Sequence, residues 1–305
     1  MFAPNCVGTA NATAAGWGNL GGGVAQIVMP LLLGALLATG IDAHTGWRLA
    51  MVVPGIALAA TAVAYWFLTQ DLPDGDYQEH RRALGMKKSM GGIRALLDTA
   101  KDRRVWALFG IYGACFGVEL TIHNIAAIYY FDHFNLDLKT AGLLAGTFGL
   151  SNIFARTLGG LLSDRVGKVW GLNGRVTLVG FLLTAEGVAL AVFSQIHVLV
   201  PAVIMMAVFA VMVHMANGAT FGVVPFVNPS ALGAVSGIVG AGGNAGAVAA
   251  GFLFRSQAVS MADGFLYLGL AVVACSLLSL LVHYRVVPES DSPTLVPATT
   301  AQRGT

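Results

Sequence analysis

Long apolar segments alternate with short polar ones along most of this chain. Each apolar segment is close to the ~20 residues that an α-helix needs to cross a bilayer. The pattern predicts eight membrane spans, at residues 18–39, 47–69, 105–131, 140–162, 175–195, 197–220, 231–253 and 263–285. The chain is therefore predicted to be an all-α polytopic membrane protein.

The composition supports this prediction and excludes several classes of protein. Hydrophobic residues make up 56% of the 305 residues and charged residues only 10%, whereas a soluble domain has about 25% charged residues. The net charge of +2 is too small to indicate nucleic-acid binding. An HExxH motif, a Ser/His/Asp set and a cysteine metal cluster are all missing from the sequence. We therefore expect neither an enzyme nor a bound cofactor.

Basic residues in the predicted loops fall mostly on one side of the membrane. The other side holds Arg48, Lys139 and Arg255. The richer side holds Arg81, Arg82, Lys87, Lys88, Arg94, Lys101, Arg103, Arg104, Arg165, Lys168, Arg175, Arg285 and Arg303. Cytoplasmic loops carry the excess of Lys and Arg. The sequence therefore predicts a multi-pass protein of the cell membrane, with both ends of this chain in the cytoplasm.

The spans and loops divide the chain into four parts. Residues 1–69 hold two spans, and residues 70–104 form a central cytoplasmic loop with a helix lying along the membrane surface. Residues 105–286 hold six further spans. Residues 287–305 are rich in Ser, Thr and Pro and are predicted to be a disordered cytoplasmic tail.

Arg156 is the sharpest functional candidate inside a span. An intramembrane charge is costly, so it indicates a functional site. Asn152 precedes Arg156 by one helical turn, which places both on one helix face. A guanidinium is a planar, always charged, forked donor that suits a small planar oxyanion. The alternative is an arginine that snorkels to the interface or stabilises a neighbouring motif.

Two carboxylates also fall within predicted spans. Glu119 and His123 are four residues apart and share a helix face, so together they could relay a proton. A helix–helix hydrogen bond is the competing interpretation, as it is for His214 and Asn217 on the sixth span. Glu186 stands among small residues and is interpreted as structural.

Residues 160–168 (GLLSDRVGK) join the fourth and fifth spans. The glycines favour a tight turn, and Asp164 can stabilise the N-terminus of a neighbouring helix. We interpret Gly160, Asp164, Arg165, Gly167 and Lys168 as a conformational gate on the cytoplasmic side.

Two glycine-dense stretches, each with an asparagine, lie in the first and seventh spans. They are residues 16–26 (GWGNLGGGVAQ) and 240–247 (GAGGNAGA). Glycine within a helix costs about 1 kcal/mol relative to alanine, so such runs indicate close approach of the backbone to another helix or to a small ligand. Both interpretations remain open for these glycines.

These segments resemble a known family. Residues 160–168 resemble the signature loop of the major facilitator superfamily. Residues 11–26 (NATAAGWGNLGGGVAQ) and 240–246 look like the first and second nitrate signatures of its nitrate/nitrite porter family. Further matches to the high-affinity nitrate transporter branch are residues 70–75 (QDLPDG), 117–120 (GVEL) and 218–227 (GATFGVVPFV).

The resemblance implies a fold and a set of sites. The family has twelve spans, and the signatures here fall where its spans 5 and 11 are expected, so the chain corresponds to spans 5–12. Arg156 matches the family's nitrate-binding arginine of span 8. The second arginine, from span 2, would precede Met1, so we expect an N-terminally truncated chain.

The function implied is secondary active transport of nitrate, and of nitrite, by proton symport or nitrate/nitrite exchange. Glu119 and His123 are the candidates for proton coupling. The substrate-binding candidates are Arg156, Asn19, Asn244, Gly22, Gly23, Gly242, Gly243 and Asn152. The expected partners are nitrate or nitrite, protons and the lipid bilayer. The alternatives are a porter for another small anion and a non-transporting membrane fragment.

Overall fold

The computed structural model describes residues 3–70, 75–83, 92–256 and 259–282. Within those residues the regular structure is helical, in ten α-helices and three short 3-10 turns. The α-helices are α1 (Val7–Ala38), α2 (Ala43–Leu68), α3 (Tyr77–Ala83), α4 (Ile93–Thr99), α5 (Arg103–Phe134), α6 (Leu138–Leu150), α7 (Asn152–Phe193), α8 (Leu199–Phe221), α9 (Leu232–Arg255) and α10 (Met261–Ser276). The 3-10 turns are Val224–Phe226, Pro229–Ala231 and Leu277–Leu281. The predicted tail at 287–305 lies outside the described residues.

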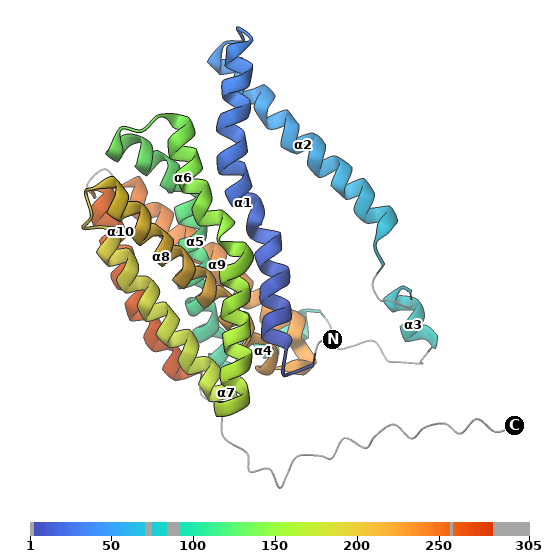
Figure 1. Ribbon diagram of the computed structural model, residues 1–305. Helices are drawn as coiled ribbons and strands as arrows, with labels where there is room; N and C mark the ends of the chain where they lie inside the picture. Colours follow the sequence, from blue (N-terminus) through green and yellow to red (C-terminus); the bar gives the residue numbers. More distant parts are fainter. Residues whose placement is uncertain (1–2, 71–74, 84–91, 257–258, 283–305) are drawn as a thin grey trace, which may run out of the picture.

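The predicted spans are found as helices of membrane length. Among the described residues, seven stretches are apolar and long enough to cross a bilayer, and one of them, Leu138–Phe193, has 56 residues. The chain reverses within this stretch at Gly171, whose φ of 63° and ψ of −159° interrupt the helix (Figure 1). It therefore supplies two crossings, and the all-α polytopic prediction is confirmed.

The predicted tight turn at residues 160–168 is wrong. Gly160 through Trp170 are helical in α7, and the chain turns at Gly171 instead. Gly160 has a packing role, because a Cβ added to it would overlap the backbone of Gly8 in α1. The glycine that the sequence pattern assigned to a turn therefore allows two helices to touch.

Helix α1 begins well before the predicted start of the first span. It starts at Val7 rather than at residue 18, and its first turn is capped from α7. The Asp164 carboxylate accepts hydrogen bonds from the backbone N–H groups of Gly8 at 3.0 Å and Thr9 at 2.7 Å, and from the Thr9 hydroxyl. The polar residues before position 18 are thus helical because a neighbouring helix satisfies their backbone. The predicted ability of Asp164 to stabilise a helix N-terminus is confirmed.

Helix α5 lies at the centre of the bundle. It is the most buried of the membrane-length helices, and it packs against α6, α8, α9 and α10. Helices α7 and α8 form another extensive contact, and α1 lies against α7 and α6. Helix α2 packs on α1 through buried Gly46 and Ala50, and then diverges from the bundle (Figure 1).

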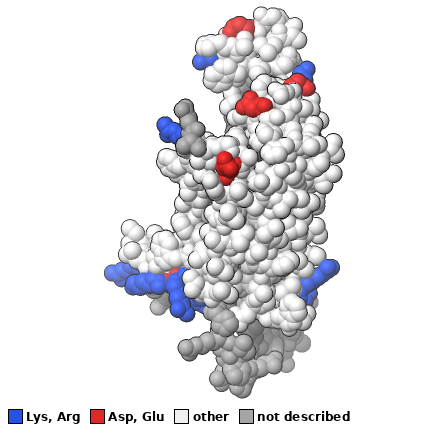
Figure 2. Space-filling view, turned by 90° about the vertical axis from the view of Figure 1, so that its left-hand side faces the viewer, with Lys and Arg blue, Asp and Glu red and all other residues white. Residues whose placement is uncertain are grey.

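Charged side chains on the surface gather at the two ends of the bundle. On the face that Figure 2 shows, Lys and Arg are concentrated at the lower end, and Asp and Glu lie mainly near the upper end. A broad band between them is almost free of charge. This distribution is typical of a protein that spans a bilayer.

Candidate functional site

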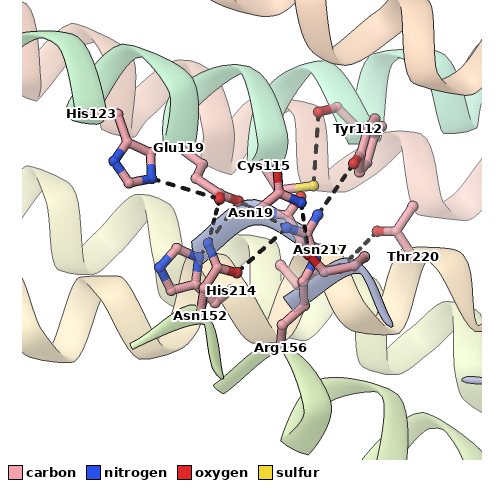
Figure 3. A network of polar contacts seen from close by, with 12 residues as sticks. Asn19, Tyr112, Cys115, Glu119, His123, Asn152, Arg156, His214, Asn217 and Thr220 are labelled. Atoms are coloured by element: carbon pink, nitrogen blue, oxygen red, sulfur yellow. Dashed lines mark hydrogen bonds and ion pairs between the residues drawn. The ribbon is translucent and has the colours of Figure 1, made fainter. Parts of the chain in front are cut away.

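A buried polar cluster lies among α5, α7 and α8 (Figure 3). Its two charged members are Glu119 on α5 and Arg156 on α7, each only 1% exposed. Asn152, His214 and Asn217 are fully buried beside them. Charges with so little solvent must be paired or hydrogen-bonded, and the cluster provides both.

The Glu119 carboxylate is the centre of the cluster. Its Oε1 accepts a hydrogen bond of 2.6 Å from the Asn152 side-chain amide. Its Oε2 accepts another of 2.6 Å from the Asn217 amide on α8. Two short bonds from different helices fix the position of the carboxylate and connect α5 to α7 and α8. The helix–helix hydrogen bonds expected for Glu119 and for Asn217 are therefore confirmed.

The Arg156 guanidinium lies against the same carboxylate. Its Nη1 is 3.5 Å from Glu119 Oε2 and 3.4 Å from Asn152 Oδ1. Its Nη2 donates to the Tyr112 hydroxyl at 3.2 Å, and its central carbon lies 5.5 Å from the centre of the Phe116 ring. At 1% exposure the side chain does not snorkel. The structure thus brings Arg156 and Asn152 together as predicted, and adds Glu119 as a counterion.

Two histidines lie beside the carboxylate (Figure 3). His214 Nδ1 is 3.5 Å from Glu119 Oε2, while its Nε2 is 3.0 Å from the backbone carbonyl oxygen of Phe148. His123 Nε2 is 3.9 Å from Glu119 Oε1. Of the two imidazoles, His214 lies closer to the carboxylate.

Glycines let the helices of the cluster come together. A Cβ added to Gly16 of α1 would lie 2.7 Å from the backbone oxygen of Asn152. One added to Gly218 of α8 would overlap the backbone oxygen of Arg156. These contacts hold α1 and α8 against the turn of α7 that carries the arginine. The close packing of helices around Arg156 therefore depends on small residues in two other helices.

The first glycine stretch borders the cluster through α1. A Cβ at Gly22 would lie 3.1 Å from the His123 ring, and one at Gly23 would lie 2.6 Å from the backbone nitrogen of Leu150. Asn19 lies beside the cluster in Figure 3, and its amide donates to the carbonyl oxygen of Ala15 in its own helix at 2.8 Å. Helix packing accounts for Gly23, while the role of Asn19 and Gly22 in binding an anion stays a prediction.

The second glycine stretch packs α9 against α5. A Cβ at Gly242 would overlap the backbone oxygen of Phe109, and one at Gly243 would lie 2.5 Å from the Phe116 ring. Asn244 is exposed, and its amide is 3.4 Å from the carbonyl oxygen of Gly240. The structure does not bring Asn244 into the cluster. Gly243 packs against the Phe116 ring, and that ring in turn lies against Arg156 of the cluster.

Asp164 and Arg175, both on α7, form a second buried polar contact, separate from the cluster around Glu119. Asp164 pairs with Arg175 Nη1 at 2.7 Å, and both side chains are about 5% exposed. The Arg175 guanidinium also donates to the carbonyl oxygens of Gly222 at 3.2 Å and Pro4 at 3.1 Å. This arrangement ties α1, both arms of α7 and the end of α8 together.

The other predicted gate residues surround this contact. Gly167 lies against the Arg175 side chain, where a Cβ would overlap the guanidinium. Arg165 and Lys168 are exposed beside it. The gate function itself stays a prediction.

Glu186, on the second arm of α7, is an isolated ionisable group. It is 0% exposed, and neither carboxylate oxygen has a hydrogen-bond partner in the described part of the chain. An ionised carboxylate is strongly disfavoured in such a place. Its position fits a protonated side chain packed between helices.

Tyr112 and Arg175 were not among the residues predicted from the sequence to form these sites. Tyr112 precedes Glu119 by seven residues, two helical turns, and so shares its face. A heptad-spaced Tyr and Glu in an apolar span is a usable signal, but a tyrosine near a span end is more often an interface anchor. Among the described residues no group of His, Cys, Asp and Glu could hold a metal ion.

Comparison with known proteins places this chain in a family. Residues 7–172 match the family model of the Major Facilitator Superfamily. The chain is 43% identical to high affinity nitrate transporter 2.5 of Arabidopsis thaliana, over 93% of this chain and 57% of the relative. It is 39% identical to high-affinity nitrate transporter 2.3 of Oryza sativa subsp. japonica, over 93% of this chain and 55% of the relative.

An algal relative extends the comparison. Nitrate transporter 2.1 of Chlamydomonas reinhardtii is 39% identical over 91% of this chain and 52% of the relative. The chain thus spans about half the length of the curated relatives it matches. The chain belongs to the major facilitator superfamily and, as its two glycine stretches predicted, to the nitrate/nitrite porter family within it.

Proposed function

We propose that this chain provides the anion-binding part of a nitrate transporter. The observation that carries the proposal is the Arg156 guanidinium, 1% exposed and surrounded by amide and hydroxyl groups near the middle of a membrane crossing. The names of the related proteins support nitrate as the substrate. The transport would be secondary and active, across the cell membrane, with nitrite as a second substrate.

The chemistry of the cluster suits nitrate. Nitrate is planar, monovalent and weakly hydrated, and a guanidinium offers two parallel N–H donors in one plane. The Asn152 and Asn217 amides and the Tyr112 hydroxyl can replace part of the water that the anion loses. Arg156 would supply the charge, and these neutral groups would supply orientation.

Movement between outward-facing and inward-facing states would use the glycine contacts. Backbones that touch at Gly160 and at Gly242 can slide without long side chains that interlock. The Asp164–Arg175 contact would act as a gate on the cytoplasmic side, and residues 70–104 would tether the two halves. Both termini of this chain would then lie in the cytoplasm.

Nitrate uptake needs an energy source. A membrane potential that is negative inside opposes anion entry by about 2.3 kcal/mol per charge for each 100 mV. Proton symport or exchange for nitrite would offset this barrier. Glu119 and His123 are the groups first expected to couple protons, and Glu119 lies directly against Arg156.

The test is uptake of labelled nitrate by proteoliposomes that contain the protein as its gene encodes it. Arg156→Lys keeps the positive charge but removes the planar fork, so we expect at least a tenfold loss of uptake at low nitrate concentration. Arg48→Lys is the matched control, because Arg48 is exposed and bonds to His44 of its own helix.

Equal uptake by Arg156→Lys and Arg48→Lys would refute the role of Arg156. Uptake that another small anion inhibits better than nitrate does would instead indicate a porter for that anion. Absence of nitrate uptake with the wild-type protein would contradict the proposed activity.

A further inference from the structure

The two ring nitrogens of His214 face different groups: Nε2 faces a backbone carbonyl oxygen and Nδ1 faces the Glu119 carboxylate. Its Nε2 is 3.0 Å from the Phe148 carbonyl oxygen, and a carbonyl only accepts, so Nε2 must carry a hydrogen. In a neutral imidazole the other nitrogen is then an acceptor. That nitrogen, Nδ1, lies 3.5 Å from Glu119 Oε2 and has no other hydrogen-bond partner in the described residues.

Two acceptors would therefore face each other unless a proton lies between them. Either His214 is protonated on Nδ1 or Glu119 is protonated on Oε2. Both side chains are at most 1% exposed, so bulk water does not reach them. The proton is then held between the two side chains rather than by one of them.

We propose that the Glu119–His214 pair is the proton-binding site that couples anion binding at Arg156 to proton uptake. This inference rests on the proposed function. The proton comes from bulk water, is held between Glu119 Oε2 and His214 Nδ1, and returns to water on the other side after the anion leaves. No covalent bond between heavy atoms changes.

The charge balance of the cluster gives the coupling its direction. Without the proton, Arg156 carries +1, Glu119 carries −1 and His214 is neutral, so the cluster has no net charge. Glu119 then already occupies Arg156 as an internal anion, with Oε2 at 3.5 Å from Nη1. The proton raises the cluster to +1, and one nitrate returns it to zero. Each anion is thus expected to require one proton.

The other ionisable groups near Glu119 do not supply this proton as directly. On α5 they are His123, whose Nε2 is 3.9 Å from Oε1, and Tyr112 and Cys115, which are buried. On α7 they are Arg156 and the isolated Glu186. Helix α8 contributes only His214 among its described residues, and the facing part of α1 contributes Asn19 and glycine. His123 remains the alternative that the experiment must separate.

The test is equilibrium binding of nitrate to the purified protein between about pH 5 and pH 8, together with proton uptake measured by a pH indicator in weak buffer. The wild-type protein is expected to take up one proton per nitrate. Where binding takes up one proton, its affinity should fall about tenfold per pH unit as the pH rises, as linkage requires.

Three variants assign the proton. Glu119→Gln removes the internal anion and keeps a side-chain donor, so it should bind nitrate with no proton uptake and no pH dependence. His214→Gln should lose most of the proton uptake near neutral pH, whereas His123→Gln should retain it. His44→Gln, at an exposed position outside the cluster, controls for loss of a histidine.

Each remaining outcome contradicts the proposal. Wild-type binding without proton uptake overturns the coupling while leaving nitrate binding intact. Proton uptake that survives in both Glu119→Gln and His214→Gln, or is lost only in His123→Gln, assigns the proton elsewhere. If the wild-type protein binds no nitrate at any pH, the proposed function itself fails. The wild-type measurement decides the coupling even if a variant does not fold.

Discussion

The second glycine stretch allows a stability test within one helix. Gly246 of α9 lies directly on Gly113 of α5, and a Cβ added to it would overlap the Gly113 carbonyl group. The same contact is seen from α5, because a Cβ at Gly117 would lie 2.7 Å from the backbone of Gly246. Gly240 lies in the same helix, and a Cβ added there would have no heavy atom within 4 Å.

The two alanine substitutions should have opposite signs. Gly246→Ala forces backbone away from backbone, and overpacking of this kind costs typically about 1–3 kcal/mol. Gly240→Ala meets open space and gains about 0.5–1 kcal/mol from the better helix propensity of alanine. The two variants should therefore differ by about 1.5–4 kcal/mol in the free energy of unfolding, with Gly246→Ala less stable than wild type.

Thermal unfolding of the purified protein in one detergent measures this difference. If α9 did not pack closely against α5, the two alanine substitutions would change the melting temperature equally. Equal melting temperatures for the two variants, or a higher one for Gly246→Ala, would refute the packing assigned to the second glycine stretch.

Three further predictions concern charged groups. Asp164→Asn breaks a buried ion pair with Arg175 and should lower stability by about 3 kcal/mol; an unchanged melting temperature would contradict the cap on α1. Glu186→Gln should leave the melting temperature unchanged, because a buried carboxyl group with no hydrogen-bond partner in the described residues is expected to be uncharged; a large decrease would indicate an ionised Glu186 carboxylate. The side-chain hydrogen bond from Arg104 lowers the pKa of the Asp102 carboxyl, so its contribution is present above the ordinary value of 3.8 and is lost as the pH falls through the lowered value. The difference in melting temperature between wild type and Asp102→Asn should be small, because the pair is partly exposed, and should vanish on acidification.

Much of the fold followed from hydrophobic length alone. Each apolar segment of about 20 residues must satisfy its own backbone in lipid, so helices are required there. The errors fell at the ends of helices. The start of α1 at Val7 depends on Asp164, which is more than 150 residues away in the chain, and no local pattern can reveal such a cap.

The site was predictable only in part. Arg156 and Glu119 were found because intramembrane charges are rare, and the spacing of Asn152 from Arg156 placed them on one face. That Glu119 is the counterion of Arg156 depends on how α5 meets α7, which residue spacing within a single helix does not encode. For Asn244 the sequence motif was misleading. The motif suggested that this side chain binds the anion, but it is exposed and lies outside the cluster.

The central claim is that Arg156 holds the transported anion in place of Glu119. A structure of the protein as its gene encodes it, determined with nitrate bound at acidic pH, tests this directly. The account predicts nitrate within hydrogen-bond distance of the Arg156 guanidinium, with the Glu119 carboxylate farther from Nη1 than the present 3.5 Å. Nitrate bound elsewhere, with Arg156 still paired to Glu119, would contradict it.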